Sequence, residues 1–312
     1  MPIFFGLIAC NLIWSAHPLM SKWMLEDFSP AQVVWLRYSS ACFAFFVLSL
    51  LKAGKSKVLF LPSSKKDLFF MILMGALTYC YSPLLQVIGL KESRVSENSL
   101  IIAIEPILTV FLAFALFQER LKKSEILGLL LSVVGFALLS GLKDELQSQR
   151  VSAHFIGNIL IFCSLLGEAS FSVLGSQLAR RYSPQAIFGT TLFLGLVFLT
   201  VSLALIEKEV YRFEYWISFL NRFSSRSFLA LLWLGPLGTT GGYLYALRAL
   251  SQVSVVSVTL LLFVQPLVGV LLGHLFYRES LSEVQVLGSF LMMLSLTLSI
   301  GVGFKNSAVQ RE

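Results

Sequence analysis

Long apolar stretches separated by short polar stretches repeat along almost the whole chain. Each stretch has about 20 residues, enough for a helix to cross the ~30 Å hydrocarbon core of a bilayer. The pattern predicts helices at 3–21, 31–51, 68–90, 95–117, 124–141, 155–178, 185–206, 227–248, 254–276 and 284–304. We therefore predict an all-α integral membrane protein with ten transmembrane helices.

Composition supports this class and argues against a nucleic-acid partner. Hydrophobic residues make up 56% of the chain and charged residues only 13%. The formal net charge is +7, but Lys and Arg gather in loops such as "KAGKSKVLFLPSSKK" at 52–66, where they set membrane topology. A small excess of these residues on the side of the N-terminus predicts that both termini are cytoplasmic.

The second half of the sequence resembles the first. "LKESRVSENSLIIAIEPILTVFLAF" aligns without a gap with "LSQVSVVSVTLLLFVQPLVGVLLGH", 160 residues later. The same alignment pairs Pro106 with Pro266 and Glu119 with Glu279. Because five helices is an odd number, the second copy must lie inverted in the membrane relative to the first. We predict a five-helix repeat at 1–141, a connecting loop at 142–153, a second repeat at 154–304 and a tail at 305–312.

Further motifs recur in a fixed order around these repeats. The fourth helix of each half ends in "FQERL" or "FYRESL", the fifth contains glycine, Trp14 lies in the first helix and "LRY" at 36–38 in the second. The chain thereby resembles the EamA branch of the drug/metabolite transporter superfamily. The resemblance implies a permease of the plasma membrane, or bacterial inner membrane, for a small organic metabolite such as an amino acid. It also implies a central cavity lined by the first, third and fourth helices and their repeat partners. In the second half, Gly167 and Glu168 stand near the place of Trp14 and Ser15, which departs from the pattern.

Pro106 and Pro266 interrupt the fourth and ninth apolar stretches. Each removes a backbone N–H, so the carbonyls of Ile102 and Leu262 need other partners inside the membrane. Matched interruptions in two halves indicate the binding region of an inverted-repeat transporter, so we expect a kink or gate there. The alternative is a packing kink filled by a neighbouring helix.

Charged side chains inside predicted helices are the next candidates. An ionised Glu105 would cost about 3 kcal/mol at a helix centre, so it should face the protein interior or water. It either exchanges a proton or binds a cationic group, or it only bonds the loosened backbone, because Gln265 fills the matched position without a charge. Glu168 is a candidate for substrate binding. Arg37 is interpreted as a structural charge that anchors a helix end or pairs with Glu168.

Aromatic and imidazole side chains complete the predicted site. His17 lies three residues after Trp14 and so shares its helix face. Tyr79 and Tyr243 lie in the third and eighth helices, and each has another tyrosine two residues later, of which only one per couple can face a cavity. The predicted substrate-binding residues are Trp14, His17, Tyr79, Glu105, Glu168, Tyr243 and Gln265.

The sequence lacks the motifs of several other classes. The four cysteines show no metal-ligand spacing, and no phosphate-binding glycine loop or paired-carboxylate motif occurs. We therefore expect no catalytic residue, metal or cofactor, and transport driven by a proton or solute gradient or by exchange. An integral-membrane enzyme acting on lipid or prenyl substrates is the alternative from another class.

The sequence alone leaves alternatives for the substrate and for the oligomeric state. The substrate could also be a nucleoside-like metabolite such as S-adenosylmethionine, or a cationic drug. Expected partners are the small-molecule substrate and membrane lipid. Gly269 and Gly273 form a small-residue pattern that fits packing inside a monomer or a weak homodimer. Glu279 is expected to anchor a helix end, and His154 is expected in a loop.

Overall fold

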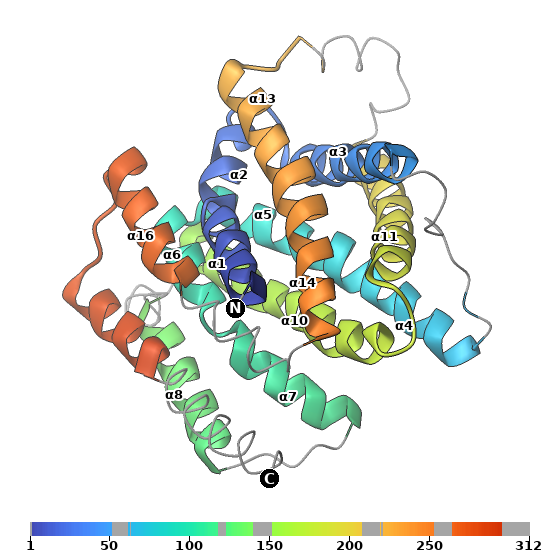
Figure 1. Cartoon of the computed structure of the whole chain (residues 1–312). Coiled ribbons are helices and arrows are strands. Elements are labelled where there is room, and N and C mark those ends of the chain that lie inside the picture. Colours follow the sequence, from blue (N-terminus) through green and yellow to red (C-terminus); the bar gives the residue numbers. More distant parts are fainter. Residues whose placement is uncertain are drawn as a thin grey trace.

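The computed structural model describes residues 2–51, 62, 64–117, 123–139, 152–207, 219, 221–252 and 264–294, and its regular structure there is helical without a strand (Figure 1). The α-helices are α1 (Pro2–Ser15), α2 (His17–Leu25), α3 (Pro30–Leu51), α4 (Lys65–Ala76), α5 (Ser82–Glu92), α6 (Val95–Ile102), α7 (Glu105–Phe117), α8 (Lys123–Leu139), α10 (Ala153–Ala179), α11 (Pro184–Ile206), α13 (Ser225–Leu232), α14 (Leu244–Leu250) and α16 (Val264–Tyr277). Two π-helical segments, η1 (Leu77–Tyr81) and η3 (Trp233–Tyr243), join α4 to α5 and α13 to α14. A last helix covers Glu283–Leu294.

Serine residues begin several of these helices. Each serine oxygen accepts a hydrogen bond from the backbone N–H three residues later, which satisfies a donor that has no partner within the helix. This holds for Ser64, Ser152, Ser183 and Ser224. Pro184 follows its capping serine in the first helical turn, where the missing N–H breaks no bond.

Breaks in the first and fourth apolar segments shape the interior. The continuous helix expected at 3–21 is wrong, because the chain breaks at Ala16 between α1 and α2. Pro18 explains this break, since a proline cannot donate to the carbonyl four residues earlier. In the fourth segment α6 ends at Ile102 and α7 begins at Glu105, one residue before Pro106; a gating role of this break stays a prediction. The residues before α16, where Pro266 should have the same effect, lie outside the described part.

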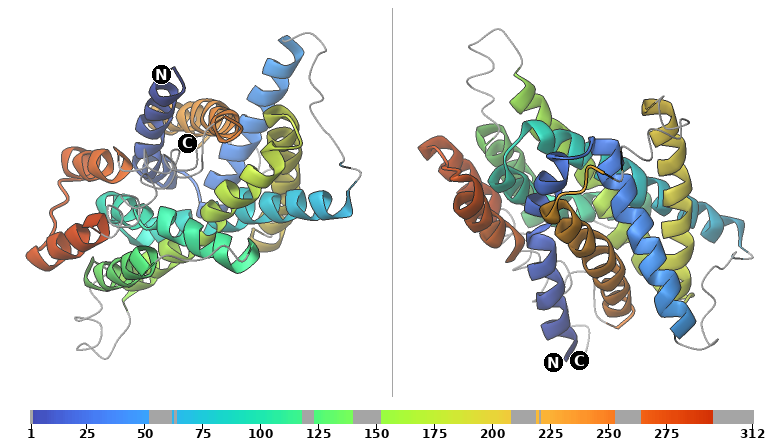
Figure 2. Two further views of the ribbon diagram at one scale, coloured as in Figure 1. Left: turned by 60° about the horizontal axis from the view of Figure 1, so that its bottom comes forward. Right: turned by 90° about the horizontal axis from the view of Figure 1, so that it is seen from above.

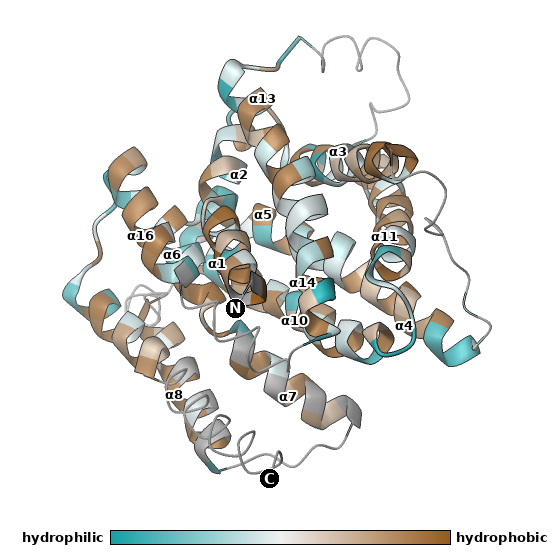
Figure 3. Cartoon of the chain, in the orientation of Figure 1, coloured by the Kyte–Doolittle hydropathy of each residue, from teal (hydrophilic) through white to brown (hydrophobic). Residues whose placement is uncertain are grey.

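Many large apolar side chains are exposed on the surface, while several polar side chains are buried. Exposed side chains include Leu51 at 76% and Phe43 at 71%, whereas Asn11, Thr78 and Asn98 are buried. Figure 3 shows apolar colour along most helices and polar colour at ends such as the start of α4. In the described ranges, four helical stretches are long and apolar enough to cross a membrane: Pro30–Leu51, Lys65–Glu92, Ala153–Ala179 and Pro184–Ile206. This distribution is typical of a membrane protein.

Helices from the two halves of the chain pack closely together. α3 packs on α11, α6 on α16, α10 on α5 and α7, and α1 on α16 and η3 (Figure 2). A Cβ placed on Gly269 would collide with Ser99 on α6, so only a glycine permits this approach. The small-residue pattern at 269 and 273 therefore serves packing within the monomer, one of the two alternatives left by the sequence.

Candidate functional site

A cavity lies where the inner helices of both halves meet. Its lining residues are Trp14, His17, Arg37, Gln86, Ile102, Glu105, Glu168, Phe171, Ser172, Tyr243, Ala246 and Gln265. The space open to the centres of water-sized molecules is about 80 Å³, several times the ~10–15 Å³ that one water requires. Six of the seven residues predicted to bind substrate line this cavity together. That they contact a substrate remains a prediction.

The break between α1 and α2 brings Trp14 and His17 against η3. The Trp14 indole Nε1 donates to the carbonyl of Gly238 at 2.9 Å, and its ring lies 5.4 Å from the Tyr243 ring. A Cβ on Gly238 would collide with the His17 imidazole, and one on Gly242 would lie 2.6 Å from Trp14 Nε1. Glycine at these two positions therefore allows η3 to form a cavity wall with both side chains.

Arg37 reaches the same wall from α3. Its Nε donates to the Thr239 hydroxyl at 3.0 Å, and a terminal nitrogen lies 3.3 Å from His17 Nδ1. Because a guanidinium only donates, His17 Nδ1 accepts and the ring proton resides on Nε2. From the sequence, Arg37 is interpreted as a structural charge, but the structure places it among the cavity residues.

Glu168 on α10 is held by two hydroxyl groups. Ser82 donates to its Oε1 at 2.9 Å and Tyr243 donates to its Oε2 at 3.1 Å. The Tyr243 hydroxyl also contacts the guanidinium of Arg37. The expected pairing of Arg37 with Glu168 is thus indirect, with a tyrosine hydroxyl between the two charges.

Glu105 and Gln265, which the repeat places at matching positions, differ in their contacts. Gln265 Nε2 donates to Oδ1 of the buried Asn11 at 2.8 Å, which fixes α16 to α1. The Glu105 carboxylate has no hydrogen bond or ion pair within the described residues, although its backbone carbonyl accepts from Thr109 at 3.0 Å. Since α7 begins at Glu105, the break before Pro106 presents this carboxylate at the cavity.

Tyr79 is the predicted site residue that does not line the cavity. It is fully buried, and its ring lies 5.7 Å from that of Tyr243. Tyr79 therefore packs against the cavity residue Tyr243 without lining the cavity itself. Of the neighbouring tyrosines, Tyr81 is 40% exposed and the Tyr245 hydroxyl donates to the Ile3 carbonyl at 3.4 Å.

Some lining residues were missed from the sequence. Gln86 could have been found, because an amide inside the apolar stretch 68–90 is unusual there. Ser172, Phe171 and Ala246 are common in any membrane helix and give no such signal. Within the described ranges no three His, Cys, Asp or Glu side chains come together as ligands for a metal ion.

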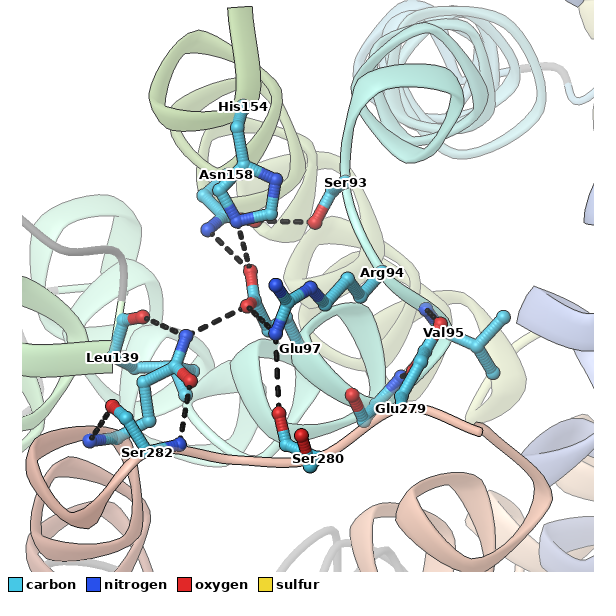
Figure 4. A network of polar contacts seen from close by, with 12 residues as sticks. Ser93, Arg94, Val95, Glu97, Leu139, His154, Asn158, Glu279, Ser280 and Ser282 are labelled. Carbon is cyan, nitrogen blue, oxygen red and sulfur yellow. Dashed lines mark hydrogen bonds and ion pairs between the residues drawn. The ribbon is translucent and has the colours of Figure 1, made fainter. Parts of the chain in front are cut away.

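A second buried polar centre surrounds Glu97 at the start of α6 (Figure 4). His154 Nε2 lies 2.8 Å from Glu97 Oε2, and Asn158 and Gln285 donate to the carboxylate at 2.7 and 2.8 Å. His154 was expected in a loop but lies in the first turn of α10, because Ser152 caps this helix. Its Nδ1 lies 3.1 Å from the Glu92 carbonyl, so both ring nitrogens face acceptors, as in a protonated imidazole.

Glu279 lies at the same end of the molecule and anchors the start of α6. Its Oε1 accepts from the backbone N–H of Val95 at 2.9 Å and its Oε2 from that of Ser96 at 2.8 Å. A carboxylate at this helix N-terminus is favourable for the helix dipole. The matched Glu119 lies outside the described residues.

Comparisons with known proteins agree with this architecture. The model of the EamA-like transporter family matches residues 1–141 and 155–301. The chain is 20% identical to the uncharacterized transporter YyaM of Bacillus subtilis over 96% of this chain and 94% of that protein. It is 24% identical to the uncharacterized inner membrane transporter YedA of Escherichia coli K12, over 96% and 90%. A solved crystal structure matches 96% of this chain and 98% of its own, with a TM-score of 0.63 and 16% identity, a likeness of fold.

Proposed function

The chain belongs to the EamA-like transporter family, and we propose on this basis that it is a secondary transporter which moves a small organic metabolite by alternating access. The cavity holds charged and polar side chains and is enclosed by apolar helices, which supports this function because a solute there is shielded from lipid. A transporter is favoured over a lipid or prenyl enzyme, since the compared relatives carry transporter names.

The proposal includes ten spans arranged as two inverted repeats, with the cavity at their interface. Recurring packing supports it: α10 contacts α5 and α7, as α1 contacts η3 and α16. π-Helical segments interrupt both the third and the eighth apolar stretch, which are repeat partners. Rocking one bundle against the other would expose the cavity to each side in turn, with both termini cytoplasmic.

The observation that carries the substrate assignment is the Glu105 carboxylate, which lines the cavity without a partner among the described residues. Such a group suits an amine on the substrate or a coupling proton. The cavity of about 80 Å³ is small beside the ~300–1,000 Å³ typical of drug-sized ligands. An amino acid or a similar small amine is therefore favoured over a nucleoside-like metabolite or a cationic drug.

Reconstitution tests this function directly. Purified protein is screened by thermal shift against amino acids, amines, nucleosides and organic acids, and the stabilising solutes are then measured for flux into proteoliposomes. We expect saturable flux of at least one small amine-bearing solute. Glu105→Gln should lower that flux at least tenfold, because the amide keeps the shape and removes the charge, as Gln265 does in the second half.

Glu283→Gln is the matched control, since Glu283 is exposed at the start of the last helix. Its flux should equal that of the wild type. If folded wild-type protein moves no solute of any class, the transporter assignment is wrong. If Glu105→Gln transports with unchanged affinity and pH dependence, Glu105 only bonds the backbone beside the kink.

A further inference from the structure

Arg37 carries a buried positive charge whose contacts are all neutral. It is 4% exposed and lines the cavity. Its partners are the Thr239 hydroxyl, His17 Nδ1, the Tyr243 hydroxyl and the Tyr38 ring, whose centroid lies 5.1 Å from Cζ. Throughout the described ranges no carboxylate lies within ion-pairing distance of this guanidinium. A buried charge without a direct counter-charge is costly, so an anion in the cavity would relieve it.

The guanidinium also has hydrogen-bonding capacity to spare. Arginine has five N–H donors, and the three hydrogen-bonding contacts found among the described residues use only part of them, while Arg37 itself lines the cavity. Glu168 is not a direct acceptor of this guanidinium within the described residues, where Ser82 and Tyr243 donate to its two oxygens. A carboxylate fits the remaining donors well, since two parallel N–H groups can bind its two oxygens.

His17 and Thr239 hold the guanidinium in place as positioning residues. The Arg37 hydrogen bond to His17 Nδ1 keeps that imidazole neutral in the assigned tautomer. The Thr239 hydroxyl in turn donates to the Leu234 carbonyl at 2.7 Å, which ties the contact to η3. In the second half Thr191 stands where the alignment of the Ser-Pro pairs would place Arg37, so the cationic group is one-sided.

We propose that Arg37 binds the carboxylate of the transported metabolite, so that the substrate carries an acidic group as well as the amine received by Glu105. This inference rests on the proposed transport function. It narrows the substrate class to zwitterions that place a carboxylate at the wall formed by α3 and η3. It also separates them from simple amines, which Glu105 alone would accept.

Matched solutes test the inference in the full-length protein. Leucine, phenylalanine and glutamine are each compared with the amide and the decarboxylated amine of the same side chain, as stabilisers in thermal shift and as competitors of flux. We expect every transported solute to carry a carboxylate, and its amide and amine to bind roughly tenfold to a hundredfold more weakly, the effect of losing a charge-assisted hydrogen bond.

Two variants connect this preference to Arg37. Arg37→Gln should remove the difference between acid and amide, and Arg37→Lys should retain part of it, because the charge remains without the fork. If Arg37→Gln does not fold, the preference of the wild-type protein for acids over their amides still tests the inference. The inference is overturned if a transported solute lacks a carboxylate, or if acid and amide compete equally. Absence of all transport would instead reject the proposed function.

Discussion

Two buried charge centres of this molecule are built in opposite ways. Around Glu97 the carboxylate receives His154, Asn158 and Gln285 at 2.7 to 2.8 Å, from α10 and the last helix. In the cavity, Glu105 has no side-chain partner in the described ranges and Arg37 has only neutral ones. Both centres lie in a protein with an apolar exterior, but only the first is complete without a ligand.

The difference separates structural charges from functional ones. A buried carboxylate with all its acceptor sites used holds helices together, and removing it leaves several donors without partners. A buried charge with unused capacity stabilises nothing by itself, and its cost is relieved when a ligand binds. Glu97 also links α6 of the first half to α10 and Gln285 of the second, so it fixes how the halves meet.

The largest expected effect is the difference in stability between two variants in which the glutamate of each centre is replaced by alanine. Glu97→Ala should lower the free energy of unfolding by about 3–5 kcal/mol, because the cations His154 and Arg94 and two amides lose their buried acceptor. Glu105→Ala should change it by less than about 1 kcal/mol, since no partner is lost and a buried charge is removed. Unfolding of both variants in detergent, followed by circular dichroism, measures the difference. Equal destabilisation would contradict the division into structural and functional charges.

A substitution in the cavity wall is expected to have a smaller effect on stability. Gly238→Ala places a Cβ against the His17 imidazole and should destabilise the protein by about 1–3 kcal/mol and reduce transport, because the wall must shift. Gly241→Ala in the same segment is the matched control, since its Cβ would meet only the Pro236 carbonyl at 3.7 Å. Thermal unfolding and flux are compared for the two. Similar losses in both would show that η3 requires glycine for its backbone and not for the contact with His17.

The smallest effect concerns a carboxylate outside the membrane-spanning segments. Burial raises the pKa of Asp27, but hydrogen bonds from Ser227 and Ser224 outweigh it and hold the pKa below its ordinary 3.8. The stabilisation is therefore present above pH 3.8 and lost as the pH falls through the folded-state pKa. Asp27→Asn should lower stability near neutral pH by less than about 1 kcal/mol.

That difference from the wild type should shrink as the pH falls below 3.8 and disappear once the pH is below the folded-state pKa, where Asp27 itself is protonated. Unfolding curves of both proteins across the acid range provide the measurement. A difference that stays constant with pH would mean that the carboxylate charge is not the stabilising feature of the contact with α13.

The helical class could be predicted because lipid imposes a simple rule. A stretch of about 20 apolar residues must be helical in a bilayer, so hydropathy alone indicated helices and no strands. The break before Pro106 followed from its missing N–H. The break at Ala16 was missed although Pro18 carries the same signal, because a proline near the middle of a helix can also be accommodated by a kink.

The candidate site was predictable where an intramembrane residue was itself unusual. Glu105, Glu168 and Gln265 stand out in apolar stretches, and the structure brings them into one cavity. Arg37 stood out too, but its charge alone could not tell a cavity wall from a helix end. Glu97 was not selected, because a charge near the end of an apolar stretch is ordinarily an interfacial residue.

The sequence by itself determined the helical membrane class and the family likeness, since both depend on the order of residues along the chain. Only the tertiary structure decided which buried charges have partners. That property depends on side chains far apart in the sequence, as when Gln285 and His154 converge on Glu97 and nothing described converges on Glu105. A charged residue looks the same in the sequence whether its side chain will have hydrogen-bonding partners or none. The difference arises only when the helices pack.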